Sequence, residues 1–306
     1  MALSMSVPMR RTAVGAVHAA DRFSPALAAS LAAPVFERTR PARQVRHGEQ
    51  AVHLAASRER LALPHGDGVL YEWGSGARTV LLVHGWRGRA SQFAPIIREL
   101  RASGCHLVAF DAPAHGDSGG RRTDIRSWTE AITRLHLKYG RFEAIVGHSL
   151  GSLAAMAAVR DGVSTRGVVG LAPMASGRYL FDAFADGMGL SAAAAAAQRE
   201  QYTRRVFPHA IDPWQRFDSI AAPLPRDVGL LLLHDRDDRE IGAAQSELLH
   251  AAHGDRSRLM LSSGSGHVRL LAADRTLDAV SAFVDGGVDG VDRLERGEER
   301  TVSAAA

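Results

Sequence analysis

Apolar runs of strand length alternate with helical patterns over most of the chain. The runs recur at residues 79–83, 106–110, 142–146, 168–171, 228–233 and 258–261. Most of them are nearly continuous in aliphatic side chains, which is typical of parallel strands that are buried on both faces. Between them, residues 91–103 and 124–139 carry apolar side chains three and four positions apart, which predicts helices that cover a sheet. The pattern predicts an α/β fold, with a mostly parallel central sheet and helices on both faces.

One internal segment, residues 174–225, interrupts this alternation. It holds a large share of the chain's aromatic residues and an alanine run at 192–197, with Ser191 as a candidate N-cap. Because alanine is the strongest helix former, we expect an inserted lid of about three helices here. The α/β core then consists of residues 58–173 and 226–285.

The two ends of the chain differ from the core in composition. Residues 1–57 are rich in alanine and arginine, and prolines at 25, 34 and 41 divide them into short pieces. We expect an N-terminal extension of one or two short helices that pack on the outside of the domain, with the first ten or so residues mobile. The alternative is that this segment contacts a membrane surface as a peripheral element. Residues 286–306 are rich in Gly, Asp, Glu and Arg, which predicts a mobile C-terminal tail.

Charge and cysteine content limit the classes of partner and compartment. The 306 residues carry a formal net charge of +4, but the arginines are scattered among acidic residues. A nucleic-acid partner is therefore not expected, because such proteins cluster basic residues with aromatics. No apolar run approaches the ~20 residues needed to cross a bilayer. Cys105 is the single cysteine, which excludes an internal disulfide and favours a reducing, cytoplasmic location. The oligomeric state stays open.

The motif Gly147-His148-Ser149-Leu150-Gly151 ends an apolar run and leads directly into an alanine-rich helical pattern. Gly-x-Ser-x-Gly in this context predicts a nucleophile elbow, a tight strand-to-helix turn that exposes the serine oxygen. The two glycines leave room for the turn, where a Cβ would collide with a neighbouring element. Ser149 is therefore the candidate nucleophile of an acyl-transfer enzyme.

A serine hydroxyl needs a base, and the base needs an orienting acid. His267 follows the last predicted strand in a loop of small residues, at the sheet edge where open α/β sheets place their ligands. For the acid, the loop after the strand 228–233 offers Asp235, Asp237 and Asp238, and spacing alone does not choose among them. We expect the two that are not used to be solvated.

An oxyanion hole completes such a site. The backbone N–H of Leu150, directly after the nucleophile, is one expected donor. The loop that follows the strand 79–83 offers the N–H of Trp86 as the second donor. We interpret the side chain of His84 in this loop as structural, hydrogen-bonded to the loop backbone.

Several short motifs in this order resemble those of the α/β-hydrolase fold family. The matching stretches are 84–93, 111–118, 147–151, 234–241 and 266–267, and the similarity runs from about residue 60 to 285. The resemblance implies that Asp238 is the catalytic acid, with Asp235 in place of the family's usual glycine. It also implies the chain order Ser, Asp, His, and a cap inserted where the lid is expected.

We therefore expect a serine hydrolase that cleaves a carboxylic ester, or a related acyl bond, of a small-molecule substrate. No cofactor and no metal are expected, because His234, His250 and His253 lack a recognisable ligand spacing. One alternative keeps the triad but transfers the acyl group to another acceptor, as in acyl transfer or perhydrolysis. A second alternative, from a different class, is a ligand-binding protein on a hydrolase fold.

Overall fold

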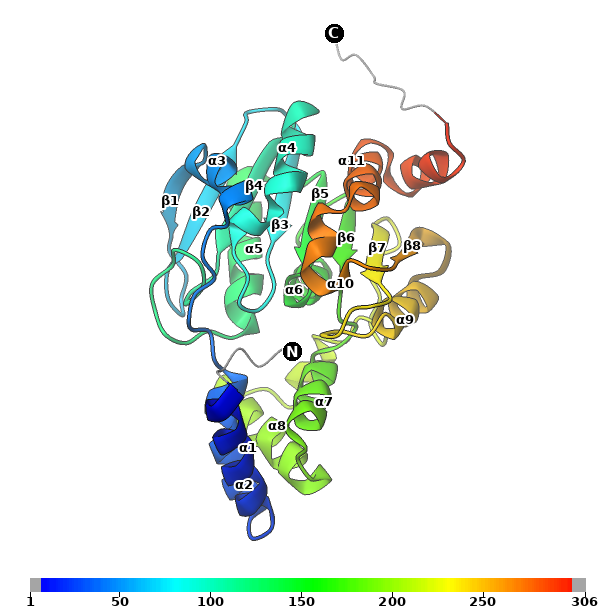
Figure 1. The fold of residues 1–306 in the computed structure, drawn as a ribbon. Coiled ribbons are helices and arrows are strands. Elements are labelled where there is room, and N and C mark those ends of the chain that lie inside the picture. Colours follow the sequence, from blue (N-terminus) through cyan, green and yellow to red (C-terminus); the bar gives the residue numbers. More distant parts are fainter. Residues whose placement is uncertain (1–6, 299–306) are drawn as a thin grey trace.

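A single eight-stranded sheet, in the order β1-β2-β4-β3-β5-β6-β7-β8, forms the centre of the molecule (Figure 1). The computed structural model describes residues 7–298, with side chains from residue 14 on. β2 pairs antiparallel with β1 and β4, and all other pairs are parallel. The strands are β1 Ser57–Leu61, β2 Gly68–Trp73, β3 Thr79–Val83, β4 His106–Asp111, β5 Ala144–His148, β6 Gly167–Leu171, β7 Gly229–Asp235 and β8 Ser257–Ser262. The mostly parallel sheet expected from the sequence is confirmed.

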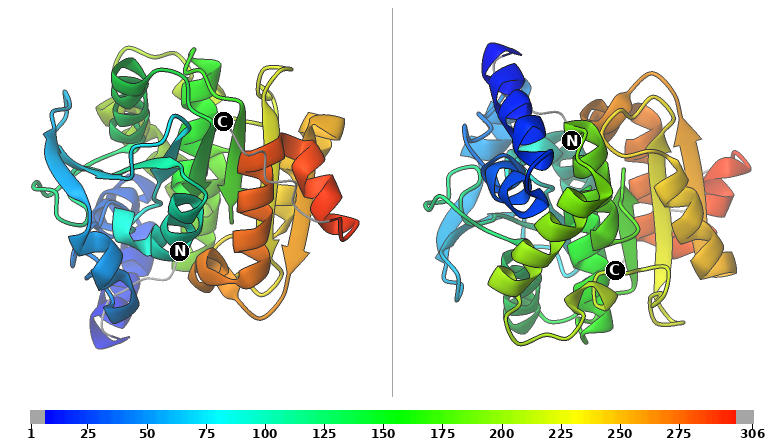
Figure 2. Two further views of the ribbon diagram at one scale, coloured as in Figure 1. Left: turned by 90° about the horizontal axis from the view of Figure 1, so that it is seen from above. Right: turned by 90° about the horizontal axis from the view of Figure 1, so that it is seen from below.

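Helices lie on both faces of this sheet (Figure 2). The helices of the α/β core are α3 Gln50–Leu54, α4 Ala94–Ala102, α5 Ile125–Tyr139, α6 Leu150–Arg160, α9 Ala244–His253, α10 Gly266–Arg269 and α11 Asp274–Glu295. In β3, Leu81 and Val83 pack into one apolar cluster with α5 and α6, whereas Val80 and Leu82 pack into a second cluster with α4 and α11. Alternate side chains of the strand thus pack into two apolar layers, one on each face of the sheet.

The N-terminal extension and the lid form one helical unit, which we call the cap. It consists of α1 Val7–Asp21 and α2 Pro25–Phe36 from the extension and of the lid, residues 174–225, which holds α7 Gly177–Met188 and α8 Ala192–Val206 (Figure 1). The ring of Phe36 stacks on Phe181 at 4.8 Å between centroids, and Asp21 accepts hydrogen bonds from the backbone and hydroxyl of Ser191. α1 and α2 therefore pack on the lid, whereas α3, at the end of the extension, packs on α4 of the core. The lid itself has two α-helices and a 3₁₀ turn at Pro213–Gln215.

The expectation of a mobile tail at residues 286–306 is wrong for its first part. α11 continues to Glu295 across a kink at Gly287, where φ is 60°. Val291 is fully buried, and Val288 and Leu294 pack beside it against the core. These three residues recur at helical spacing, which the glycine-rich and acidic composition obscured. Residues 299–306 lie outside the described part of the chain.

The mobility expected for the first ten or so residues is tested only in part. Residues 7–10 already belong to α1, and residues 1–6 lie outside the described part. In the region that the structure describes, none of the helices combines the length and apolar character that a membrane crossing requires.

Candidate active site

Ser149 occupies a strained turn between β5 and α6. Its backbone has φ 55° and ψ −122°, a conformation that non-glycine residues rarely adopt. A Cβ on Gly147 would lie 2.6 Å from the backbone of Ser152, and one on Gly151 would lie 2.2 Å from Val83 O. Both positions therefore require glycine, and the turn has the geometry of a nucleophile elbow.

His267 and Asp238 meet beside this turn. The Nδ1–H of His267 donates to Asp238 Oδ2 at 2.7 Å, and the Asp238 side chain is fully buried. Asp238 Oδ1 accepts the backbone N–H groups of Glu240 and Ile241 at 2.8 and 3.0 Å. Because Nδ1 is occupied, Nε2 is the ring nitrogen of His267 that remains for a serine proton. His267 and Ser149 line the same cavity.

Opposing effects act on the Asp238 carboxylate. Burial alone would raise the pKa of Asp238, but hydrogen bonds from His234 and His267 outweigh it and hold that pKa well below its usual range. Asp238 is therefore ionised throughout the neutral range. An ionised acceptor behind Nδ1 favours the imidazolium that proton abstraction creates.

The other two aspartates hold the loop that carries His267. Asp235 Oδ2 accepts the hydroxyl of Ser262 at 2.8 Å and the backbone N–H of Ser265 at 2.9 Å, while Asp237 accepts Gly264 N–H at 2.7 Å. Asp235 is fully buried, so the expectation that both unused acids are solvated is wrong for this residue. Asp237 is exposed. Burial favours a raised pKa for Asp235, but backbone N–H donors from Gly266 and Ser265 lower the pKa overall.

The loop after β3 lies directly against the elbow. A Cβ on Gly85 would lie 2.8 Å from Ser149 Cβ, so only glycine permits this approach. His84 donates from Nδ1 to Gly85 O at 2.7 Å and accepts Ala112 N–H on Nε2 at 3.0 Å, which is the structural role expected for it. Burial lowers the pKa of His84 to about 4, so the ring is neutral. Trp86 follows Gly85 in this loop, and Leu150 begins α6 on the other side of Ser149.

Residues 111–118 hold the loop after β3 in place through hydrogen bonds. The carboxylate of Asp111 accepts Ala90 N–H at 2.6 Å, Asp117 N–H at 2.8 Å and the hydroxyl of Tyr71 at 2.9 Å. His115 Nε2 accepts the N–H of Arg87 at 2.8 Å. Burial lowers the pKa of His115 to about 3, so this acceptor is not protonated at neutral pH. The backbone around Trp86 is thus anchored on both sides by uncharged histidines.

Comparison with known proteins agrees with this geometry. A family model described as the alpha/beta hydrolase family matches residues 80–283, more than half of the chain. The chain belongs to the alpha/beta hydrolase family. The search of curated proteins found no match.

Solved structures show the same fold at low sequence identity. The alpha/beta hydrolase domain-containing protein 10 from mouse is 16% identical, with a TM-score of 0.59 over 78% of this chain and 100% of that one. An esterase from Pyrococcus furiosus is 18% identical, with a TM-score of 0.59 over 81% of this chain and 97% of that one. A bacterial membrane phospholipase A is 18% identical, with a TM-score of 0.56 over 79% and 91%.

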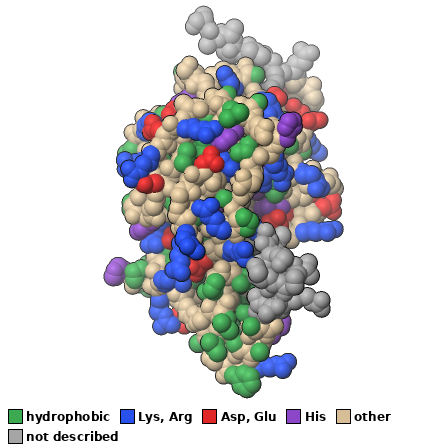
Figure 3. Space-filling view, turned by 60° about the vertical axis from the view of Figure 1, so that its left-hand side comes forward, with side chains coloured by type: hydrophobic (Ala, Val, Ile, Leu, Met, Phe, Trp, Pro, Cys, Tyr) green, Lys and Arg blue, Asp and Glu red, His purple; other side chains and the backbone are tan. Residues whose placement is uncertain are grey.

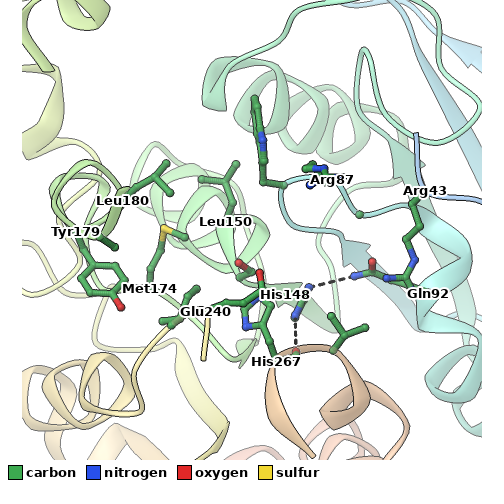
Figure 4. Close-up of a pocket in the computed structure, with 16 residues that line it drawn as sticks. Arg43, Arg87, Gln92, His148, Leu150, Met174, Tyr179, Leu180, Glu240 and His267 are labelled. Atoms are coloured by element: carbon green, nitrogen blue, oxygen red, sulfur yellow. Dashed lines mark hydrogen bonds between the residues drawn. The ribbon is translucent and has the colours of Figure 1, made fainter. Parts of the chain in front are cut away.

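In this family member, a chain of hydrogen bonds connects the loop after β3 to the candidate base. Gln92 Nε2 donates to His148 Nδ1 at 3.1 Å, and His148 Nε2 donates to the backbone oxygen of His267 at 3.0 Å (Figure 4). The rings of His148 and His267 lie 4.6 Å apart. Burial holds the pKa of His148 well below its ordinary value, so the ring is neutral and can accept from Gln92. The sequence analysis missed both residues, although His148 occupies a variable position inside the elbow motif.

A cavity of about 250 Å³ opens above Ser149. Its walls come from the loops at the carboxyl ends of the strands, from α7 of the cap and from Arg43, which follows α2 (Figure 4). Among the described residues, no group of three or more His, Cys, Asp and Glu is arranged to hold a metal ion. His250 and His253 instead bond Ser257 Oγ and Leu249 O, both at 2.7 Å.

Proposed function

We propose that this protein is a serine hydrolase that cleaves carboxylic esters through an acyl-enzyme on Ser149. The observation that carries the proposal is the position of Ser149 on a strained elbow, in one cavity with His267, whose Nδ1 bonds the buried Asp238. A nucleophile, a base and an ionised orienting acid are the three parts that acyl transfer from an ester requires.

The mechanism assigns one role to each group. His267 Nε2 accepts the hydroxyl proton of Ser149 while its oxygen attacks the ester carbonyl. The N–H groups of Leu150 and Trp86 stabilise the developing oxyanion, each worth roughly 10²-fold or more in rate. The imidazolium then returns the proton to the leaving alcohol. A water deprotonated by His267 attacks the acyl-enzyme and releases the carboxylic acid, while Asp238 orients the imidazole throughout.

The neighbours of known activity point in the same direction. Both the Pyrococcus esterase and the bacterial phospholipase A are named for the hydrolysis of acyl esters. The cavity beside Ser149 carries aliphatic and aromatic side chains from α7, including Tyr179 and Leu180, which suit an acyl chain. An ester of an apolar acid is therefore the substrate class with the most support.

A fluorophosphonate probe tests the nucleophile directly. We expect covalent labelling of the wild-type protein and none of Ser149→Ala, with turnover of p-nitrophenyl esters lost in parallel. Equal labelling of both proteins would overturn the assignment of Ser149. Adding a competing alcohol or peroxide during turnover separates hydrolysis from acyl transfer, because a new ester or a peracid would then appear.

A further inference from the structure

The cavity above Ser149 has two chemically different walls. Leu150, Met174, Tyr179 and Leu180 form an apolar wall, and Arg43, Arg87 and Gln92 lie on the opposite side (Figure 4). His267 lies between the two, and Ser149 lines the same cavity. A substrate that reaches both walls from one reacting carbonyl must therefore be amphiphilic.

Each of the two arginines has an acidic neighbour, and further arginines lie near both of them. Arg43 pairs with Glu49 at 3.1 Å, and Arg87 lies near Glu240, which lines the same cavity. In both arginines the Nε atom is buried and has no hydrogen-bond partner among the described residues. Burial lowers the pKa of each guanidinium, which remains charged at neutral pH. Both arginines line the cavity, so an anionic ligand group there would lie near two guanidinium charges and could accept charge-assisted hydrogen bonds from them.

The apolar wall continues beyond the cavity. Trp86, Leu150 and Leu180 also line a narrow apolar crevice that runs between the core and the cap. Phe36, Phe181, Tyr202 and Trp214 complete this crevice. An apolar chain leaving the reacting carbonyl on this side thus finds an aromatic lining made by the cap.

From these contacts we propose that the substrate is an ester with an apolar chain on one side and an anionic group, a carboxylate or a phosphate, held by Arg43 and Arg87 on the other. This inference rests on the proposed function, since it names the substrate class of the same site. It adds a charge requirement that the triad alone does not impose.

The test compares two matched ester pairs, and the members of each pair differ only in carrying a carboxylate or its neutral primary amide. One pair carries the carboxylate on the acyl part of the ester and the other carries it on the alcohol part. The comparison therefore shows which part of the ester the arginines bind. We expect the wild type to prefer the anionic member of one pair, by kcat/KM. Arg43→Gln and Arg87→Gln should each reduce that preference roughly tenfold, as expected for a charge-assisted bond.

The control is Arg226→Gln, which removes an exposed arginine outside the cavity and should leave the preference unchanged. If the ratio of kcat/KM for the anionic and the neutral ester is the same in the wild type and in both cavity variants, the charge requirement is overturned. The assignment of Ser149 as the nucleophile would not be affected by that result. A wild type that neither cleaves any ester nor labels with fluorophosphonate would overturn the proposed function as well. The two failures are therefore distinguishable.

A second and independent feature lies at the outer end of the cap. Phe23, Leu27 and Leu31 recur every four positions along α2 and the turn before it, and 88%, 51% and 44% of their respective surfaces are exposed. The opposite side of α2, with Ala28, Ala32 and Phe36, is buried. We call the three exposed residues the apolar row. Figure 3 shows hydrophobic side chains gathered at this end of the molecule, with Lys and Arg side chains gathered above them.

A basic groove begins where α2 ends. Arg38, Arg40, Arg121, Arg122 and Arg205 line this groove. Arg40 is held in place by a 3.0 Å bond from its guanidinium to Gly120 O, and Arg205 pairs with Glu37. Among the described residues that line it, Glu37 is the acidic one, so the groove keeps an excess of positive charge.

We further propose that this face docks on an anionic lipid surface. The apolar row would enter the boundary between headgroups and acyl chains, and the basic groove would face the headgroup charges. The charge complementarity of arginines beside an exposed apolar row favours a lipid surface over a neutral protein partner. Docking there would bring the cap, which also lines the crevice near Ser149, to the membrane.

Sedimentation of the full chain with vesicles tests this proposal. We expect binding to vesicles of phosphatidylcholine with one third phosphatidylglycerol, weak binding to phosphatidylcholine alone, and release by high salt. The double variant Leu27→Ser/Leu31→Ser should weaken binding about tenfold or more. Arg121→Ser/Arg122→Ser should remove most of the preference for anionic vesicles.

Ile211→Ser is the matched control, because Ile211 is exposed on another part of the cap surface and should not affect binding. No binding by the wild type, or unchanged binding by both double variants, would overturn the proposal. A dimer in light scattering that Leu27→Ser/Leu31→Ser dissociates would overturn it too, because the face would then belong to a second copy of the chain.

Discussion

The loops around Ser149 and the cap above them are held by different kinds of interaction. In the loops, buried Asp111, Asp235 and Asp238 each accept two or more hydrogen bonds from neighbouring segments. In the cap, aromatic rings do most of the packing, such as Phe36 on Phe181 and Phe181 on Trp214 at 4.8 and 4.9 Å. Directional bonds fix a catalytic geometry within fractions of an ångström, whereas apolar packing fixes a shape and tolerates exchange. The chemistry and the substrate preference are therefore expected to respond to different substitutions.

The largest expected effect comes from the acid at the centre of the loops. Asp238→Asn keeps the side-chain volume but removes the charge, and should lower kcat by roughly 10⁴-fold because the imidazolium loses its partner. Asp237→Asn, beside it and exposed, is the matched control and should keep most of the activity. Steady-state kinetics on one p-nitrophenyl ester measure both. Equal losses of kcat in the two variants would show that activity depends on the conformation of the loop and not on the charge of Asp238.

Substitutions in the aromatic packing of the cap should lower the free energy of unfolding more than they lower kcat. Phe36→Ala opens a space beside Phe181, Phe184 and Tyr202 and should cost about 3 kcal/mol or more of unfolding free energy, provided that cap and core unfold together. Phe23→Ala, at an exposed site, should change it by less than about 0.5 kcal/mol. Urea unfolding measures both variants. The preferred acyl chain length of Phe36→Ala should shift, because Phe36 lines the apolar crevice.

The buried neutral histidines of the loops predict a pH dependence of stability. Burial lowers the pKa of His84 to about 4 and that of His115 to about 3, below the ordinary value near 6.5. Below that value the unfolded chain binds protons that the folded protein does not, so stability is lost as the pH falls. From about pH 7 to about pH 5 the loss should be roughly 2 kcal/mol per histidine.

Urea unfolding at several pH values checks this expectation. His115→Gln should reduce the pH slope, whereas His209→Gln, at an exposed site, should not change it. A slope that His115→Gln leaves intact would show that the pH response does not come from the loops.

The smallest expected effect tests His148 as a positioning residue. His148→Ala removes the bond to the backbone of His267 and should lower kcat about tenfold, with a smaller change in KM, because the base loses its alignment. His148→Asn keeps a side-chain donor and should recover part of the loss. A general structural role would instead raise KM or lower stability, and the conservative variant would not rescue kcat.

The sequence pattern predicted the core well because local signals and tertiary contacts agree there. The apolar side chains of the strand at 79–83 and of the helix at 124–139 recur with the period of the element each one forms, and these side chains are the ones that the core buries. The helical tail was missed because Val288, Val291 and Leu294 stand among Asp289, Gly290, Asp292 and Arg293. The burial of Asp235 was missed for a different reason, since its partners Ser262 and Ser265 come from the end of β8 and the loop after it.

The sequence by itself determined the alternation of strands and helices, the glycines that the elbow requires, and the candidates Ser149 and His267. The alternation and the glycines follow from side-chain period and from steric room, which are local properties of the chain. The choice of Asp238 among the three aspartates came from the resemblance to the hydrolase family. Only the tertiary structure showed that α1 and α2 join the lid, that His148 connects Gln92 to His267, and that Arg43 reaches the cavity of Ser149. Such contacts join segments far apart in the chain, and a single sequence carries no periodic signal for them.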